Sequence, residues 1–392
     1  AGYQRYYWEK GPGIVKGVDG DFLINEMIPS LVEKPWQISV GGSFVSKYQA
    51  DDDPIYALPK NVGAGAGRMQ FSLAGFNLMA EYAYKANDPS SDNGLIYRPG
   101  QAFLVNASYS RSGLGIPLST KWVDNMSFRS NRNALATDLN INQLPEITRN
   151  HTYSLTAFYP YATQPKGEFG VQGEVMYKFK RNTPLGGKYG TSVALNYSRV
   201  MNTLQTQIDE FTPIGAKGTY GYNTDFFSIG DSLYFQDINF EFSKKWTSDL
   251  KTILIYQNIV YNYNILRGTA DHEIVYAHCA VADISYNFTS EVSLHTEMQA
   301  LFTEQDKGNW GMLLFEFSIP KWFITVADNW NYGNPDPAYR THYLMGGIGY
   351  NHSGNRIQIS YGKQREGITC VGGVCRAVPA SNGLMISISS TF

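Results

Sequence analysis

The chain has 392 residues and a formal net charge of −2; aromatic residues make up 14% of it and charged residues only 17%. Compared with an average soluble domain, this chain is rich in aromatic residues and poor in charge. A net charge this small gives no electrostatic reason to expect a nucleic acid partner, and no run of about 18 apolar residues is present to form a transmembrane helix.

Alternation of apolar and polar residues, the pattern of half-buried β-strands, recurs along most of the chain. In chain order it predicts strands at 19–28, 36–46, 75–85, 101–110, 168–179, 189–198, 234–243, 252–263, 273–288, 291–302, 311–319, 322–330, 343–351, 356–364 and 382–392. These segments are longer than the usual globular strand of about 5 to 6 residues and suit the 9 to 11 or so with which a tilted strand crosses a bilayer. The sequence therefore predicts an all-β, single-domain, transmembrane antiparallel up-and-down β-barrel of about 18 to 20 strands.

The connections between these strands alternate between short and long. Short turns are predicted at 181–188, 244–249, 287–290, 319–321 and 352–355, and long loops at 201–231, 264–272, 303–309, 331–341 and 365–382. Short periplasmic turns at one rim and long extracellular loops at the other are typical of bacterial outer-membrane barrels. We therefore expect a Gram-negative outer membrane as the location and its lipid bilayer as a partner.

The two faces of the strands differ in the way that such a barrel requires. Apolar residues alternate with charged ones of both signs, which suits lipid outside and a polar lumen inside. The candidate lumen-lining residues are Glu81, Lys85, Glu168, Glu174, Lys178, Asp237, Glu241, His295 and Glu297.

Tryptophans occur near both ends of the predicted strands. Trp36, Trp246 and Trp322 are next to short turns, and Trp8, Trp310 and Trp330 are next to long loops. Two such bands match the aromatic girdles at the two membrane interfaces. The alternative is that tryptophan is simply common in strands.

The middle of the chain is the least regular part. Alternating strands and loops can be followed back from the C-terminus to 151–159 and forward from the N-terminus to about 118–130. The two halves agree if one more strand crosses at 134–142, which gives the even strand number that bacterial barrels have. The alternative is that 131–150 is a long loop.

Few residues suggest chemistry. Cys370 and Cys375 flank two glycines in the last long loop and are expected to form a disulfide there, whereas Cys279 lies alone in a strand as a packing residue. Asp271, His272 and Glu273 could suggest a surface hydrolase, but contiguous residues in a strand point to opposite faces. The glycine-rich stretch 63–67 leads into a strand rather than a helix, so it indicates a bend in the wall instead of a phosphate site. We predict no metal, no cofactor and no enzymatic activity.

The C-terminal strand resembles the signal that the barrel-assembly machinery reads in bacterial outer-membrane proteins. Ile386, Ile388 and the terminal Phe392 lie on one face of it, and closing the barrel would pair this strand with the first one. The stretches 125–168, 226–235 and 367–392 resemble an uncharacterised family of Bacteroidetes outer-membrane barrels, classed as a domain of unknown function. Its members are longer at the N-terminus. Since this chain begins inside what looks like a strand at 3–9, its first strands are expected to be missing or supplied separately.

Three classes of function are compatible with the sequence. The first is a porin-like channel with a charged lumen, in which loop 201–231 would help to set what passes. The second is a structural or accessory barrel in a complex with other outer-membrane proteins or lipoproteins. The third is a surface-exposed barrel hydrolase. A measurement of conductance would distinguish the channel from the accessory barrel, and the sequence favours the channel.

Overall fold

The computed structural model describes residues 1–6, 8–134, 138–371 and 374–390, without the side chains of residues 6 and 368–377. Strands dominate it, as the alternating pattern predicts. The strands are β1 (Gly2–Tyr6), β2 (Glu9–Leu23), β3 (Trp36–Tyr48), β4 (Asn61–Leu73), β5 (Phe76–Lys85), β6 (Gly100–Arg111), β7 (Leu114–Asp124), β8 (Gly167–Lys178), β9 (Thr191–Met201), β10 (Leu233–Lys245), β11 (Leu250–Asn262), β12 (Ile274–Asn287), β13 (Ser293–Phe302), β14 (Trp310–Ile319), β15 (Trp322–Trp330), β16 (His342–His352), β17 (Asn355–Gln364), β18 (Gly367–Val371), β19 (Val374–Val378) and β20 (Ser381–Ser390).

Helical structure is confined to short connections. The helical elements are α1 (Ile24–Met27), α2 (Tyr263–Arg267) and the 3-10 turns η1 (Pro29–Leu31) and η2 (Pro337–Tyr339). None of the helices in the described part of the chain has the length and apolar character needed to span a membrane.

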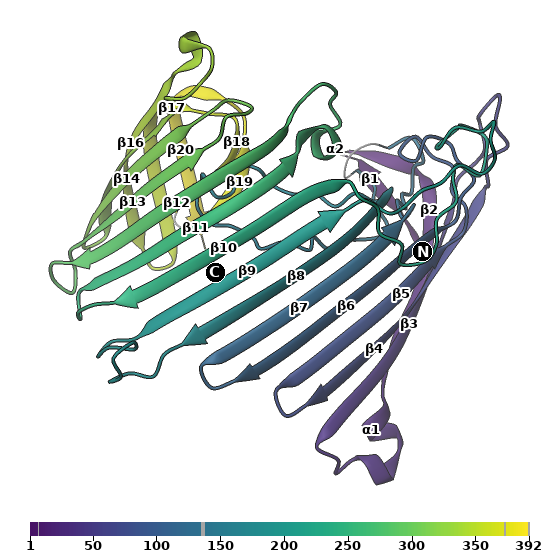
Figure 1. Cartoon of the computed structure of the whole chain (residues 1–392), viewed down its shortest axis with the longest axis horizontal. Helices are drawn as coiled ribbons and strands as arrows, with labels where there is room; N and C mark the ends of the chain where they lie inside the picture. Colours follow the sequence, from purple (N-terminus) through teal and green to yellow (C-terminus); the bar gives the residue numbers. More distant parts are fainter. Residues whose placement is uncertain (7, 135–137, 372–373, 391–392) are drawn as a thin grey trace.

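Eighteen strands form a single antiparallel sheet, and β18 and β19 form a separate hairpin. Each strand from β1 to β17 pairs with the next one along the chain, and β17 then pairs with β20. Figure 1 shows the sheet strongly curled, with β16 to β20 turned back at one side and β1 and β2 at the other. The prediction that the terminal strand pairs with the first one is not met among the described residues, where β20 pairs only with β17.

The connections are sorted by length between the two rims, as predicted. At one rim, β4 joins β5 through Ala74 and Gly75, which have φ of 45° and 84°. Positive φ at both central residues is the two-residue hairpin turn that matches the twist of the strands, and Ser353 and Gly354 repeat it between β16 and β17. The predicted long loops lie at the opposite rim, whereas the connection 24–35 with α1 and η1 and the connection 179–190 are longer exceptions at the first rim (Figure 1).

The longest of these loops overturns one prediction. Residues 125–166, between β7 and β8, contain no named strand in their described part, so the strands expected at 134–142 and 151–159 are wrong and the long-loop alternative is right. Residues 135–137 lie outside the described residues. Residues 153–157 instead form a turn, in which the Ala157 N–H donates to the Tyr153 carbonyl at 3.0 Å, and Pro160, which has no N–H to donate, follows it.

The two faces of the curled sheet have opposite character. On the convex face, Ile348 of β16 lies between Ile324 of β15 and Ile359 of β17, and Ile386 of β20 extends the row. All four side chains are exposed. The concave face carries buried residues, both polar, such as Asp237 and Gln257, and apolar, such as Ile259 and Leu301, and the described part of loop 125–166 lies on it.

Candidate functional site

The concave side of the sheet is crossed by residues 125–166, which we call the inward segment. At one end of the sheet, the Gln4 amide of β1 donates to the Asn140 carbonyl at 2.6 Å, and a Cβ at Gly13 of β2 would overlap the Ser130 carbonyl. At the other end, the Arg365 guanidinium, just after β17, donates to the Ser154 carbonyl at 3.3 Å. The inward segment therefore spans the concave side from the first strands to the last ones.

Arg149 is the main ionic anchor of the inward segment. Its guanidinium lies 3.3 Å from a carboxylate oxygen of Glu174 on β8 and also pairs with Glu241 on β10. The same guanidinium donates to the Asn239 side chain at 2.7 Å. One cation thus joins two strands that are separated by β9, and it places a positive charge between two carboxylates that would otherwise repel each other.

A row of alternating residues continues this attachment. His151 Nε2 lies 2.5 Å from Asp237 Oδ2 on β10, and the Tyr153 hydroxyl donates to Asp283 Oδ2 on β12 at 2.8 Å. The backbone N–H of Leu155 donates to the Gln299 side chain on β13 at 2.8 Å. Residues 151, 153 and 155 therefore each contact the sheet through a side chain or a backbone N–H, although no ladder of backbone hydrogen bonds forms.

The next residues of the inward segment pack into an apolar cluster. Leu155, Tyr159 and Tyr161 are buried, and they belong to one cluster with the concave-face residues Ile255, Ile259, Tyr261, Val281, Leu301, Met312 and Leu314. Cys279 is fully buried in the same cluster, as expected of a packing residue. The concave face is thus apolar beneath 153–161, which differs from the uniformly polar lumen that the sequence predicts.

Trp310 belongs to this apolar cluster and not to an outer aromatic girdle. It is only 2% exposed, and its ring packs on Phe158 with the centroids 5.2 Å apart. The assignment of Trp310 to an interface band is therefore wrong, because position 310 of β14 points to the concave side. The Arg365 guanidinium lies over the Phe158 ring, and burial lowers the pKa of Arg365 to about 10.

Two buried lysines of the wall hold the inward segment by hydrogen bonds to its backbone carbonyls. Lys85 of β5 donates to the Ser127 carbonyl at 2.5 Å. Lys121 of β7 pairs with Glu168 of β8 and also donates to the Pro145 carbonyl. Buried charges are expensive unless they are paired and hydrogen-bonded, so these contacts indicate a defined position for the segment.

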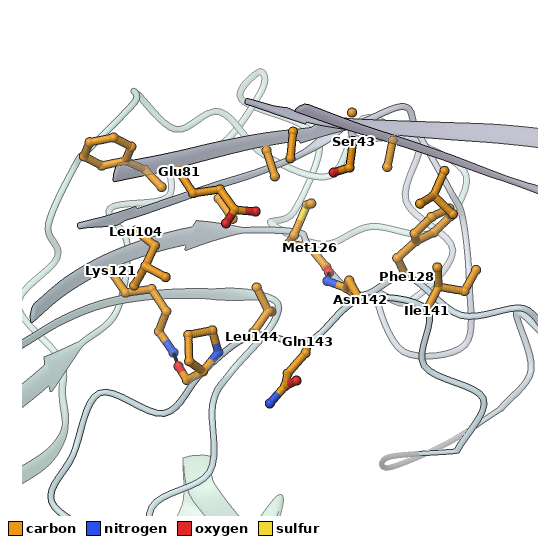
Figure 2. Close-up of a pocket in the computed structure, with 18 residues that line it drawn as sticks. Ser43, Glu81, Leu104, Lys121, Met126, Phe128, Ile141, Asn142, Gln143 and Leu144 are labelled. Carbon is orange, nitrogen blue, oxygen red and sulfur yellow. Dashed lines mark hydrogen bonds between the residues drawn. The ribbon is translucent and has the colours of Figure 1, made fainter. Parts of the chain in front are cut away.

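A cavity of about 300 Å³ remains between the inward segment and the wall of β3 to β7. Figure 2 shows Glu81 and Lys121 on the strand side of it and Asn142 and Gln143 on the segment side. Apolar residues such as Phe128 complete its lining. Small-solute sites have this combination of an apolar wall and a few polar groups.

Part of loop 202–232 packs on the convex face of the sheet. Phe226 packs against Trp122 of β7 at 5.1 Å and against Phe103 of β6 at 5.9 Å. Phe227 packs against Phe169 of β8 at 5.4 Å. Since these strand positions point to the convex face, residues 226–227 cover the outside of the wall, whereas the Thr219 carbonyl of the same loop accepts from the Tyr97 N–H, between β5 and β6, at 2.8 Å.

Comparison with known proteins identifies a family but no activity. A model of the family of unknown function DUF6029 matches residues 1–392. The chain belongs to the DUF6029 family. No curated protein is significantly similar to this DUF6029 chain.

Some solved structures resemble the DUF6029 chain distantly. They include the outer membrane protein opdK from Pseudomonas aeruginosa, with 9% identity and a TM-score of 0.41 over 97% of this chain and 93% of that one. Another is a mutant of Rh. blastica porin, with 12% identity and a TM-score of 0.35 over 91% of this chain and 100% of that one. At TM-scores this low, the resemblance contributes nothing to the argument about function.

The predicted lumen-lining residues of the DUF6029 chain occupy concave-face positions, and all but Lys178 fall in three groups. Glu81, Lys85 and Glu168 lie around the cavity and the start of the inward segment. Glu174 and Glu241 pair with Arg149, and Asp237 contacts His151. His295 and Glu297 lie together on β13. Lys178 lies apart from them, exposed near the short turns. Whether these residues line a conducting pore is a separate question.

Sequence reasoning missed Arg149, His151 and Asp283 in this DUF6029 chain. The available signal was an excess of carboxylates on the inward positions of β8 and β10, with lysines only at the short-turn ends of those strands. Arg149 supplies a cation from the long loop, and His151 supplies a hydrogen-bonding ring. Asp271, His272 and Glu273 are exposed in the loop before β12.

The other predicted residues have mixed outcomes. Trp8, Trp246, Trp322 and Trp330 are exposed and Trp36 is half-buried, and Ile386 and Ile388 are exposed on β20. Phe392 lies outside the described residues. The backbones of Cys370 and Cys375 are direct partners in the β18–β19 hairpin, but their side chains are not described.

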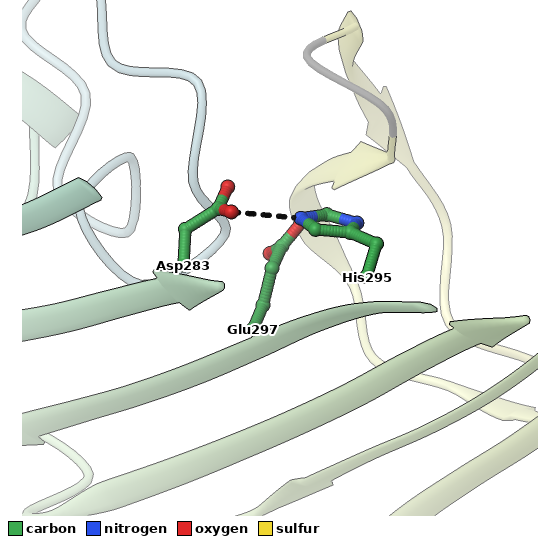
Figure 3. Close-up of side chains that lie close together, drawn as sticks. All are labelled: Asp283, His295 and Glu297. Atoms are coloured by element: carbon green, nitrogen blue, oxygen red, sulfur yellow. Dashed lines mark ion pairs between the residues drawn. The ribbon is translucent and has the colours of Figure 1, made fainter. Parts of the chain in front are cut away.

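Asp283, His295 and Glu297 form a compact group on β12 and β13 of the DUF6029 chain (Figure 3). His295 Nε2 lies 3.1 Å from Asp283 Oδ1 and 3.9 Å from Glu297 Oε1. Among the described residues, this is the only group of three or more histidine, cysteine or acidic side chains close enough to share one ion.

Proposed function

We propose that this chain is an integral outer-membrane protein of a Gram-negative bacterium, with its convex face in contact with lipid. The observation that carries the proposal is the exposed apolar surface of that face. Its exposed members include Leu195, Tyr197, Ile238, Phe240, Leu254, Tyr256, Leu313, Phe315, Phe317, Ile324, Val326, Leu344, Ile348, Ile357, Ile359, Leu384, Ile386 and Ile388. Soluble monomers rarely expose an apolar patch of more than a few hundred Å², and a bilayer removes the need to bury this one.

Several expectations from the sequence belong to the same proposal. They are a Bacteroidetes source and insertion by the barrel-assembly machinery through the C-terminal strand. Sorting of the loops between the two rims supports the outer-membrane setting, because extracellular loops are long and periplasmic turns short in outer-membrane barrels. Charged groups on the concave side are compatible with a water-filled interior.

Within that setting, the function favoured here is a non-enzymatic, porin-like channel of restricted bore. The inward segment would narrow the lumen, and the space between it and β3 to β7 would be the route for small solutes. The polar groups of Glu81, Lys121, Asn142 and Gln143 around the cavity support this assignment.

A second candidate is a structural or accessory barrel of an outer-membrane complex. It is favoured by the extent of the inward segment, which contacts both ends of the sheet and buries an apolar cluster beneath it. A lumen filled in this way would conduct little or nothing. Its partners would be other outer-membrane proteins or lipoproteins.

Conductance across planar bilayers tests the two candidates. For a channel we expect discrete steps for the purified full chain, and we expect Glu81→Ala in the cavity to change their size or ion selectivity more than Lys178→Ala near the short turns. A silent protein that is correctly inserted would contradict the channel, and native co-purification in mild detergent would then identify the partners. A chain that stays soluble and monomeric without detergent would contradict the membrane assignment itself.

A further inference from the structure

We propose that Asp283, His295 and Glu297 form a binding site for a divalent transition-metal cation, with Zn²⁺ as the ion that fits best. The site lies on the concave face of β12 and β13, and the channel proposal does not depend on it. One imidazole nitrogen and two carboxylate oxygens are a ligand set that zinc accepts.

The strand register brings the three ligands together. Asp283 and Glu297 are directly paired across β12 and β13, and His295 is two residues before Glu297, on the same face. Their ligand atoms all lie within 4.8 Å of one another. Tetrahedral zinc with bonds of about 2.0 to 2.2 Å holds its ligand atoms roughly 3.3 Å apart, so the 3.1 Å and 3.9 Å separations require little movement.

Groups outside the cluster hold the second oxygen of each carboxylate. The Tyr153 hydroxyl of the inward segment donates to Asp283 Oδ2 at 2.8 Å, and the Gln299 amide donates to Glu297 Oε2 at 3.0 Å. Asp283 Oδ1 and Glu297 Oε1 are therefore left facing His295 Nε2 (Figure 3). Hydrogen bonds of this kind orient the ligands of protein metal sites.

The charge and accessibility of the site also suit a cation. Two carboxylates share a single imidazole, and Glu316 of β14, directly opposite His295, adds a third negative group that is paired with Arg356 at 3.4 Å. The His295 side chain is 29% exposed, whereas those of Asp283 and Glu297 are 13% and 9% exposed. An ion can thus reach the imidazole from the concave side while the carboxylates stay largely shielded from water.

The simpler interpretation is a protonated His295 paired with Asp283, without any metal. Isothermal titration of the metal-free, full-length protein in detergent with ZnCl₂ separates the two, provided that circular dichroism shows each variant folded. We expect one Zn²⁺ per chain, and at least a tenfold loss of affinity in both His295→Asn and Glu297→Gln. Tyr153→Phe removes only an orienting hydrogen bond, so we expect a loss of about tenfold, smaller than that of either ligand variant.

His342→Asn is the matched control, since His342 pairs with a single carboxylate, that of Asp328, at 2.6 Å. It should leave the zinc titration unchanged. The proposal is overturned if the wild-type chain binds no Zn²⁺. It is equally overturned if His295→Asn binds as well as the wild type, or if His342→Asn loses as much affinity, because zinc would then be held elsewhere on the surface.

Discussion

Replacing Arg149 by alanine should release the inward segment from the concave face. In the structure, the Arg149 guanidinium contacts Glu174, Glu241 and Asn239 at once. The change removes these contacts and leaves two carboxylates close together without their shared cation. We therefore expect local opening of the segment and an otherwise intact sheet.

The size of the effect follows from the exposure of the ion pairs. The side chains of Arg149, Glu174 and Glu241 are 23%, 14% and 26% exposed. A fully exposed pair contributes about 0 to 1 kcal/mol, and breaking a fully buried one costs about 3 to 5 kcal/mol. Partial burial places the loss for Arg149→Ala at about 1 to 3 kcal/mol, which corresponds to roughly a 5- to 150-fold rise in the open population.

Hydrogen exchange of the amides in 147–158 measures that population directly. Arg149→Lys keeps the charge but not the two-pronged geometry, so its effect should be intermediate. Arg181→Ala, in the exposed turn between β8 and β9, is the control for loss of an arginine and should change nothing. Unchanged exchange in folded Arg149→Ala would refute the view that this residue anchors the segment.

Three further predictions concern the outer face, a loop and the last hairpin. Val326→Arg, at the exposed centre of β15, should destabilise the protein in liposomes by about 2 to 4 kcal/mol. Ser387→Arg, on the concave face, should destabilise it by less. Equal losses of stability for the two variants in urea unfolding would contradict the lipid contact. The backbone N–H of Phe211 donates a hydrogen bond to the Asp209 carboxylate, and this bond is the largest cause that holds the pKa of Asp209 below its ordinary 3.8. The stabilisation of that turn should therefore be present above pH 3.8 and lost as the pH falls through the folded pKa, and an NMR carboxyl titration with a midpoint at or above 3.8 would disprove it. Mass spectrometry of unreduced protein should find Cys370 linked to Cys375, whereas two free thiols would exclude the disulfide.

Periodicity in the sequence predicts most of the sheet because a strand with one lipid-like face has a strict period of two. Strand β15 begins and ends where the pattern does, at Trp322 and Trp330. The same rule fails for 151–155, where His151, Tyr153 and Leu155 also alternate. They too meet the sheet at every second residue, but through contacts with side chains. Alternation alone does not separate a strand from such a loop, since residues 153–157 form a turn in which the Ala157 N–H donates to the Tyr153 carbonyl.

The candidate sites show the same limit. The inward orientation of Glu174, Asp237 and Glu241 follows from alternation along each strand. Their partners Arg149 and His151 come from a loop whose course depends on contacts between residues far apart in the chain. Asp283 was overlooked for a related reason: its role appears only when the register sets it opposite Glu297.

The course of the inward segment also constrains the order of folding. Residues 149–158 of the segment precede in sequence the strands they rest on: Leu155 and Gln299 are 144 positions apart, and Ser154 and Arg365 are 211 apart. Contacts of such long range form late, because the loop between them must close first. The strands would therefore assemble around an empty interior, and the segment would settle there only once β13 and the residues after β17 are in place. A chain stopped before Gln299 would leave Leu155 without its partner, so a nascent or truncated form should have an interior more open than that of the finished protein.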